Sequence, residues 1–179
     1  MEYEYIDLYD KNRIPTGMAV QRGSKLPDET YRIVVHVCIF NSKGEMLIQQ
    51  RQSTKKVFPD MWDLSAGGQV ESGETSDMAA QREVYEELGL YIHFSGKRPV
   101  AAMNFDEGFD DIYVIVRDTE LSELTIQDEE VKAVGWADKE KILSMINDGK
   151  FVPYYPEYIA WLFASVSQDR TFWNEGKGK

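Results

Sequence analysis

Residues 68–90, which read GQVESGETSDMAAQREVYEELGL, decide the fold. A helix is predicted from about Thr75 to Leu88, because apolar residues recur there at helical spacing and Gly89 is well placed to end the helix. Residues three and four positions apart lie on the same face of a helix. The spacing therefore predicts that one helical face carries three carboxylates, those of Glu83, Glu86 and Glu87.

The three glutamates indicate a site for a hard cation. Carboxylates at this spacing repel one another by roughly a few tenths of a kcal/mol for each close pair. A divalent ion such as Mg²⁺ removes that repulsion, prefers oxygen ligands and bridges to substrate phosphates. Acidic clusters on helices are usually solvated surface, and for Glu86 and Glu87 alone that reading is favoured. The sequence around the cluster has to distinguish the two readings.

That surrounding sequence has fixed spacings. Gly68 is followed after five residues by Glu74, and after seven more by residues 82–90, REVYEELGL. The whole pattern resembles the signature of the Nudix hydrolases at every specified position. The resemblance implies an α+β fold, a Nudix α/β/α sandwich in which a mixed, largely antiparallel sheet lies between helices. It also implies Mg²⁺-dependent hydrolysis of a diphosphate linkage in a small molecule, such as a nucleoside diphosphate linked to another moiety or a related phosphoanhydride.

The same resemblance assigns roles to individual residues. The expected ligands of Mg²⁺, or of Mn²⁺ as a substitute, are the carbonyl of Gly68 and the carboxylates of Glu83, Glu86 and Glu87. Glu74 is expected to support the ligands, and glycine at position 68 permits close backbone approach and an unusual φ. Arg82 is expected to orient a glutamate, which gives a catalytic set of Arg82, Glu83 and Glu86. The general base stays open among Glu86, Glu107, Glu129 and Glu130.

Similarity beyond the signature indicates the branch of the family that contains isopentenyl diphosphate isomerase and its hydrolase relatives. It extends over about residues 4–153, for example through residues 47–51 (LIQQR) and 59–63 (PDMWD). Basic and aromatic residues in this region are candidates for substrate binding: Arg51, Lys55, Lys56 and Trp62. For the basic residues, ordinary surface charge is an equally good explanation.

The isomerase is the sharpest alternative, because it protonates carbon instead of cleaving a phosphoanhydride. It needs a cysteine followed by Gly-His just before the helix, whereas this chain has Gly67-Gly68-Gln69. Cys38 is the one cysteine, and its apolar surroundings predict burial on a strand. A second alternative is a Nudix-fold module that binds a nucleotide without cutting it, but such modules tend to lose the glutamates that this chain retains. The residues favour hydrolysis.

The rest of the chain predicts one domain in which strands and helices are mixed. Strands are expected at about residues 3–9, 18–22, 31–41, 46–51, 62–66, 99–105, 111–117 and 134–136. Further helices are expected at about 139–147 and 158–166. The domain covers residues 1–166, with N-terminal strands in 1–28, a core in 29–153 and a C-terminal helix in 154–166. Residues 167–179 are expected to form a flexible tail.

Composition limits the possible partners. The chain has 179 residues and a net charge of −11, from 20 basic and 31 acidic residues. Such a charge disfavours nucleic acid polymers and anionic membranes, but a small phosphorylated substrate stays possible if metal ions neutralise the site. No apolar run approaches the roughly 20 residues of a membrane span. With one cysteine and no signal peptide, a cytoplasmic monomer or homodimer is expected.

Overall fold

The computed structural model describes residues 4–166, which form a seven-stranded mixed sheet, a two-stranded ribbon and three α-helices. The strands are β1 (Tyr5–Tyr9), β2 (Pro15–Gln21), β3 (Arg32–Phe40), β4 (Met46–Arg51), β5 (Trp62–Asp63), β6 (Ala66–Gln69), β7 (Ala101–Phe105), β8 (Gly108–Val116) and β9 (Val131–Ala137). The helices are α1 (Ser76–Leu88), α2 (Lys139–Asn147) and α3 (Pro156–Ser165), with a short 3-10 turn, η1 (Leu121–Glu123). The predicted tail, residues 167–179, lies outside the described residues.

Strand β3 is the centre of the large sheet. It pairs in parallel with β8 along its whole length and antiparallel with β6. Strand β4 meets β3 only where Phe40 faces Met46, and it then pairs antiparallel with β5 and β9. Every strand pair except β3 with β8 is antiparallel. The prediction of a mixed, largely antiparallel sheet is confirmed.

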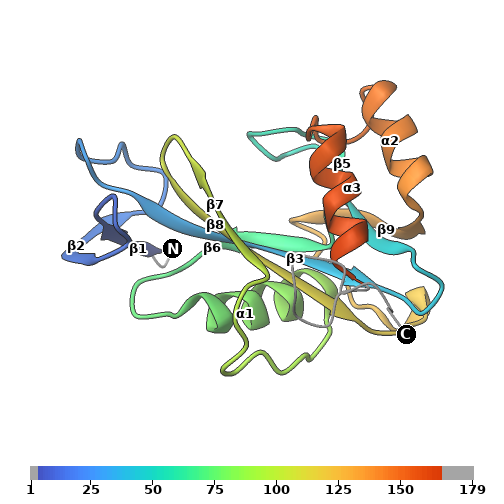
Figure 1. The fold of residues 1–179 in the computed structure, drawn as a ribbon, viewed down its shortest axis with the longest axis horizontal. Helices are drawn as coiled ribbons and strands as arrows, with labels where there is room; N and C mark the ends of the chain where they lie inside the picture. The colour runs from blue at the N-terminus through green and yellow to red at the C-terminus, as the bar shows by residue number, and fades with distance from the viewer. Residues whose placement is uncertain (1–3, 167–179) are drawn as a thin grey trace, which may run out of the picture.

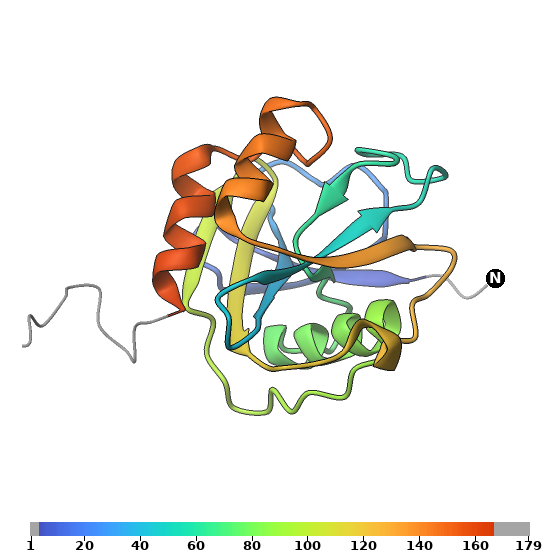
Figure 2. The same ribbon diagram turned by 90° about the vertical axis from the view of Figure 1, so that its right-hand side faces the viewer.

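The sheet lies between helices, as Figure 1 and Figure 2 show, with α1 on one face and α2 and α3 on the other. The alternation of side chains along β3 explains both layers. Val35 and Val37 pack in the core cluster beneath α1, whereas Cys38 and Phe40 pack in the cluster beneath α2 and α3. The α+β sandwich is therefore confirmed, and Cys38 is fully buried on a strand as predicted.

Helix α1 has the bounds that its end signals predict. Thr75 is the N-cap residue, and Gly89 adopts a φ of 68° and donates its backbone N–H to the carbonyl of Tyr85. Ala79, Ala80, Val84 and Leu88 are buried against the sheet. Met78 is one of the apolar residues on which the helix was predicted, but it is 53% exposed and lies outside this buried set. No helix among residues 4–166 is long and apolar enough to cross a membrane.

The segment before α1 differs from the prediction. Residues 62–66 were expected as one extended piece followed by a loop at Gly67 and Gly68, but both glycines lie within strand β6. There Gly67 pairs with His36 and Gly68 with Val35. The unusual φ expected for Gly68 is wrong, because its φ is not positive. Glycine is required at this position for space alone.

Candidate active site

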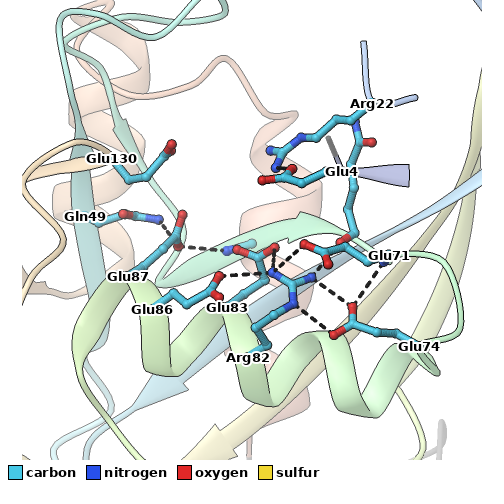
Figure 3. Close-up of polar contacts among 12 residues, drawn as sticks. Glu4, Arg22, Gln49, Glu71, Glu74, Arg82, Glu83, Glu86, Glu87 and Glu130 are labelled. Atoms are coloured by element: carbon cyan, nitrogen blue, oxygen red, sulfur yellow. Dashed lines mark hydrogen bonds and ion pairs between the residues drawn. The ribbon is translucent and has the colours of Figure 1, made fainter. Parts of the chain in front are cut away.

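Helix α1 presents the three predicted glutamates beside β6, as Figure 3 shows. The helical spacing does bring them together, but their environments differ. Glu83 and Glu87 are buried, with 6% and 7% of their surface exposed, because they face the sheet. Glu86 lies at the edge of the helix, and 46% of its side chain is exposed. The cluster therefore has two buried carboxylates and one that reaches solvent.

Arg82 connects the glutamates into one network (Figure 3). Its Nη1 donates to Glu83 at 2.8 Å and to Glu86 at 3.1 Å. Its Nε and Nη2 donate to the two carboxylate oxygens of Glu74, both at 2.9 Å, and Nη2 also donates to the carbonyl of Gln69. Burial lowers the pKa of Arg82, but the bonds to Glu74 and the charge of Glu83 raise it by more. The guanidinium is therefore a fixed positive charge.

Glu74 anchors this network at the start of the helix. Besides its paired bonds from Arg82, its Oε2 accepts the backbone N–H of Glu71 at 3.1 Å. Glu71 itself lies 3.7 Å from Nη1 of Arg82. Glu74 thus holds the guanidinium from the side away from Glu86. The supporting role of Glu74 stays a prediction, and the structure shows that its carboxylate bonds Arg82.

The side chain of Glu87 bonds two strands of the sheet, β4 and β6. Its Oε2 accepts hydrogen bonds from Nε2 of Gln49 on β4 at 2.9 Å and from the backbone N–H of Gly67 at 3.1 Å. Burial raises the pKa of Glu87 to about 8, and the neighbouring charge of Glu83 adds to the rise, although the two hydrogen bonds oppose it. The two neutral donors therefore offset only part of the effect of burial on this carboxylate.

Glu83 lies directly against the backbone of Gly68. A Cβ atom at Gly68 would be 2.0 Å from Oε1 of Glu83, a separation that no real side chain can adopt. Burial raises the pKa of Glu83, even though the charge and hydrogen bond of Arg82 lower it. The sequence therefore needs glycine at 68 so that a buried carboxylate can approach the strand.

The donor set suits a hard divalent cation. Three carboxylates lie together beside β6, and oxygen donors of this kind are preferred by Mg²⁺ and Mn²⁺; the carbonyl of Gly68 is the fourth donor that the family resemblance implies. Two of the carboxylates are buried without full compensation, which a cation would supply. Within residues 4–166 no three acidic, imidazole or thiol groups already converge to hold a metal ion. In this structure Glu83 and Glu86 are bonded to Arg82 instead.

Comparison with known proteins decides the family. Residues 30–162 match the NUDIX domain. The chain belongs to the Nudix family. It is 48% identical over 149 residues to a Nudix hydrolase of Listeria monocytogenes, which covers 83% of this chain and 88% of the relative. An isopentenyl-diphosphate Delta-isomerase of Klebsiella pneumoniae is 28% identical over 153 residues, 82% of each chain.

Solved structures agree with this assignment. The crystal structure of the Deinococcus radiodurans protein DR0079 superposes with a TM-score of 0.72 at 26% identity, covering 92% of this chain and all of that one. The protein is thus a Nudix pyrophosphohydrolase. Nudix hydrolases act on small phosphorylated substrates and generally use divalent metal ions.

Two residues next to the cluster of Glu83, Glu86 and Glu87 were not predicted from the sequence. Arg22, just after β2, lies on the side of the carboxylates away from α1 (Figure 3), and its charge lowers the pKa of Glu83. It pairs with Glu4 at 2.5 Å. Gln49 is the other neighbour, through its bond to Glu87. Neither has a local signal in the sequence, because each comes from a strand that only the fold brings to the Nudix helix.

The basic residues predicted to bind substrate are partly engaged elsewhere. Nη1 of Arg51 lies 3.2 Å from Asp63, and its Nε donates to the carbonyl of Val57. Lys55 pairs with Glu130. Lys56 is exposed on the loop between β4 and β5. Trp62 is partly buried in the cluster beneath α2 and α3. Trp62 therefore has a packing role, and the ion pairs restrain Arg51 and Lys55.

The candidate general bases differ in their relation to the Nudix glutamates. Glu86 is part of the cluster, and Glu130 lies beside Glu87, whose pKa its charge helps to raise (Figure 3). Glu107 pairs with Arg32 at 2.7 Å in the turn between β7 and β8. Glu129 is exposed in a turn. The structure therefore brings Glu86 and Glu130 to the site.

Proposed function

We propose that this enzyme hydrolyses a diphosphate linkage in a small molecule with Mg²⁺ as its metal and Mn²⁺ as a substitute. The observation that carries the proposal is the burial of Glu83 and Glu87 against the glycines of β6, where Arg82 pairs with Glu83 and only neutral donors bond Glu87. A buried carboxylate needs a compensating charge to remain ionised. A divalent ion held by the Gly68 carbonyl, Glu83, Glu86 and Glu87 would supply that charge and polarise the phosphoryl oxygens.

The residues around the proposed metal site have different proposed roles in this reaction. Glu86 is the proposed base, because its exposed carboxylate can accept a proton from an attacking water. Glu130 is the alternative base, since it lies beside Glu87. Arg82 orients Glu83 and Glu86, and Arg22 faces the cluster as a cation that can meet a phosphate. Arg51, Lys55, Lys56 and Trp62 remain proposed substrate contacts, in which Arg51 and Lys55 would leave their ion pairs to meet a phosphate and Trp62 would stack on a base.

The proposed substrate is a nucleoside diphosphate linked to another moiety, or a related phosphoanhydride. A small anion can be accommodated because the metal neutralises the site, whereas a net charge of −11 disfavours nucleic acid polymers and anionic membranes. The proposed setting is a cytoplasmic monomer or homodimer. Phosphoryl transfer needs positioning and charge neutralisation more than covalent chemistry, and the residues of the cluster suit that need.

Two features favour hydrolysis over isomerisation. Gly67 replaces the cysteine that supplies the acid in the isomerase, and Cys38 is fully buried. The space in which a side chain at position 67 would lie is also filled, because a Cβ atom there would be 2.9 Å from Cδ2 of His36. Burial also raises the pKa of the Cys38 thiol far above its ordinary value, so this group is unsuited to proton transfer.

The test is a substrate screen in ¹⁸O-labelled water with Mg²⁺. Nucleoside di- and triphosphates, nucleotide sugars, dinucleotide cofactors and prenyl diphosphates are incubated with the enzyme, and products are analysed by mass spectrometry. Hydrolysis places one ¹⁸O in a phosphate product, and Glu83→Gln abolishes it, whereas the exposed helix-α2 variant Glu140→Gln retains it. Conversion of isopentenyl diphosphate to its dimethylallyl isomer, or ligand binding without labelled phosphate, would contradict the proposal.

A further inference from the structure

His36 is a polar side chain in the middle of the central strand. It lies between Val35 and Val37, which face α1, so its imidazole is on the opposite face of β3, the face that carries α2 and α3. Three quarters of its side-chain surface is covered. The residue is therefore on the far side of the sheet from Glu83 and Glu87, and no step of the proposed reaction uses it.

The imidazole is held from two sides on this face. Nδ1 lies 2.9 and 2.8 Å from the two carboxylate oxygens of Asp110, which is on the adjacent strand β8. This contact makes Nδ1 the protonated donor. The ring of Tyr154 packs edge-on against His36 with centroids 6.4 Å apart, and its hydroxyl donates to Oδ1 of Asp63 at 2.8 Å. The ring is consequently fixed in both position and tautomer.

The third contact of His36 is the strand that carries the two glycines. His36 pairs with Gly67 in the sheet, and a Cβ atom at Gly67 would be 2.9 Å from Cδ2 of the imidazole and 2.8 Å from the carbonyl oxygen of Val35. The ring thus lies directly beneath Gly67. From the α1 side, the backbone N–H of Gly67 donates to Glu87 at 3.1 Å. The same segment is therefore contacted by His36 from one face and by a buried glutamate from the other.

We propose that His36, held by Asp110, is a positioning residue that supports the Gly67–Gly68 segment against Glu83 and Glu87. The inference rests on the proposed function, because its effect on catalysis depends on these glutamates binding metal. The imidazole fixes how far the segment can move away from α1. That distance controls the hydrogen bond from the backbone N–H of Gly67 to Glu87 and the space between Gly68 and Glu83.

The test measures the site in metal-free and metal-bound protein. The amide resonances of Gly67 and Gly68 are followed by NMR, and the dissociation constant for Mn²⁺ is measured by electron paramagnetic resonance. His36→Ala is expected to shift the Gly67 amide and to weaken Mn²⁺ binding about 10- to 100-fold, the range found when groups that orient metal ligands are removed. Asp110→Asn is expected to have a smaller effect of the same kind. The matched control is His93→Ala, at the other, exposed histidine, which should change neither signal.

Two further variants separate positioning from simple packing. His36→Asn keeps a donor close to the place of Nδ1 and should recover part of the Mn²⁺ affinity, whereas His36→Leu fills space without bonding Asp110 and should not. Equal recovery by both variants would overturn the proposal, as would a folded His36→Ala protein with unchanged amide shifts and Mn²⁺ affinity. If His36→Ala does not fold, an unchanged Asp110→Asn protein overturns it. A wild-type protein that binds no Mn²⁺ defeats the proposed function, and the Gly67 amide then still tests the role of His36.

Discussion

At the scale of single residues, the three glutamates of α1 differ in how far their side chains are exposed to solvent. Glu83 and Glu87 are buried, and burial raises the pKa of each. Glu86 is exposed and bonds Arg82 at 3.1 Å. A charge-removing substitution should therefore affect folding and catalysis in different proportions at the three positions.

The substitution Glu86→Gln should separate catalysis from stability. The exposed ion pair between Glu86 and Arg82 stabilises the fold by about 0.3–0.5 kcal/mol. The unfolding free energy should therefore change by no more than about 0.5 kcal/mol. Turnover should fall by at least about 100-fold, because a ligand and the proposed base are lost together. Stability is measured by a thermal melt without metal. Turnover is measured by a rate assay on the best substrate found in the screen. Equal losses of stability and rate would make Glu86 a structural residue.

Gly68→Ala should damage the site through a single methyl group. Because the new Cβ would be 2.0 Å from Oε1 of Glu83, the carboxylate or the strand has to move. We expect Mn²⁺ affinity to fall by at least about tenfold, by analogy with the loss of other ligand-orienting contacts. Gly135→Ala on β9 is the matched control, since its Cβ would meet nothing closer than 3.8 Å. Titration by electron paramagnetic resonance compares the two, and equal affinities would remove Gly68 from the site.

At the scale of secondary structure elements, the ion pair between β3 and β8 gives the fold a dependence on pH. Burial lowers the pKa of His36, but the charge and hydrogen bond of Asp110 raise it by more, with help from Asp63 and Glu87, to about 9. The unfolded value is about 6.5. Protonated His36 therefore stabilises the fold fully below about pH 6.5, and this contribution is lost as the pH rises through about 9.

The expected result is a pH-dependent difference in unfolding free energy between the wild type and His36→Asn. The difference should be largest near pH 6 and should shrink toward pH 10, because asparagine at position 36 does not titrate whereas the imidazole loses its proton. Urea unfolding at several pH values measures it. His93→Asn, at the exposed histidine, is the control for the loss of an imidazole that has no carboxylate ion-pair partner among residues 4–166. A difference for His36→Asn that does not change with pH would contradict the assignment of a charged pair.

Elements with strong local signals were predicted well, and those defined by distant pairing were not. The C-terminal end of α1 follows from Gly89, which is a local end signal, and the start predicted at about Thr75 is one residue from the observed one. Strand β6 was missed because Gly67 and Gly68 have the local appearance of a turn, and only their pairing with β3 makes them a strand. The shared face of Glu83, Glu86 and Glu87 followed from helical spacing, and the roles of Arg82 and Glu74 followed from the family resemblance. Arg22 and Gln49 come from other strands and have no local signal.

At the scale of the whole molecule, the excess negative charge and the proposed cation site both affect the equilibrium between the folded and unfolded states. The chain carries 31 acidic and 20 basic residues, so self-repulsion opposes the folded state. Any salt screens that repulsion. A cation that binds only the folded site adds stability by mass action.

MgCl₂ should therefore raise the melting temperature more than NaCl at equal ionic strength. At about 100 times the dissociation constant, specific binding adds about 2.7 kcal/mol, or about 5–10 °C for a chain of this size. Glu87→Gln should lose most of this excess while keeping the response to NaCl, because one ligand charge is gone. Differential scanning calorimetry is the measurement. Equal responses to both salts in the wild type would mean that Mg²⁺ acts only by screening.

Because the imidazole of His36 fills the space beneath Gly67, positions 36 and 67 cannot evolve independently. A mutation that adds a side chain at position 67 meets the imidazole and the carbonyl oxygen of Val35 at the same time. A cysteine introduced at position 67 of this chain would therefore need room on β3, from the imidazole and from the backbone of Val35. In this fold, supplying the acid of the isomerase is a change to two strands at once.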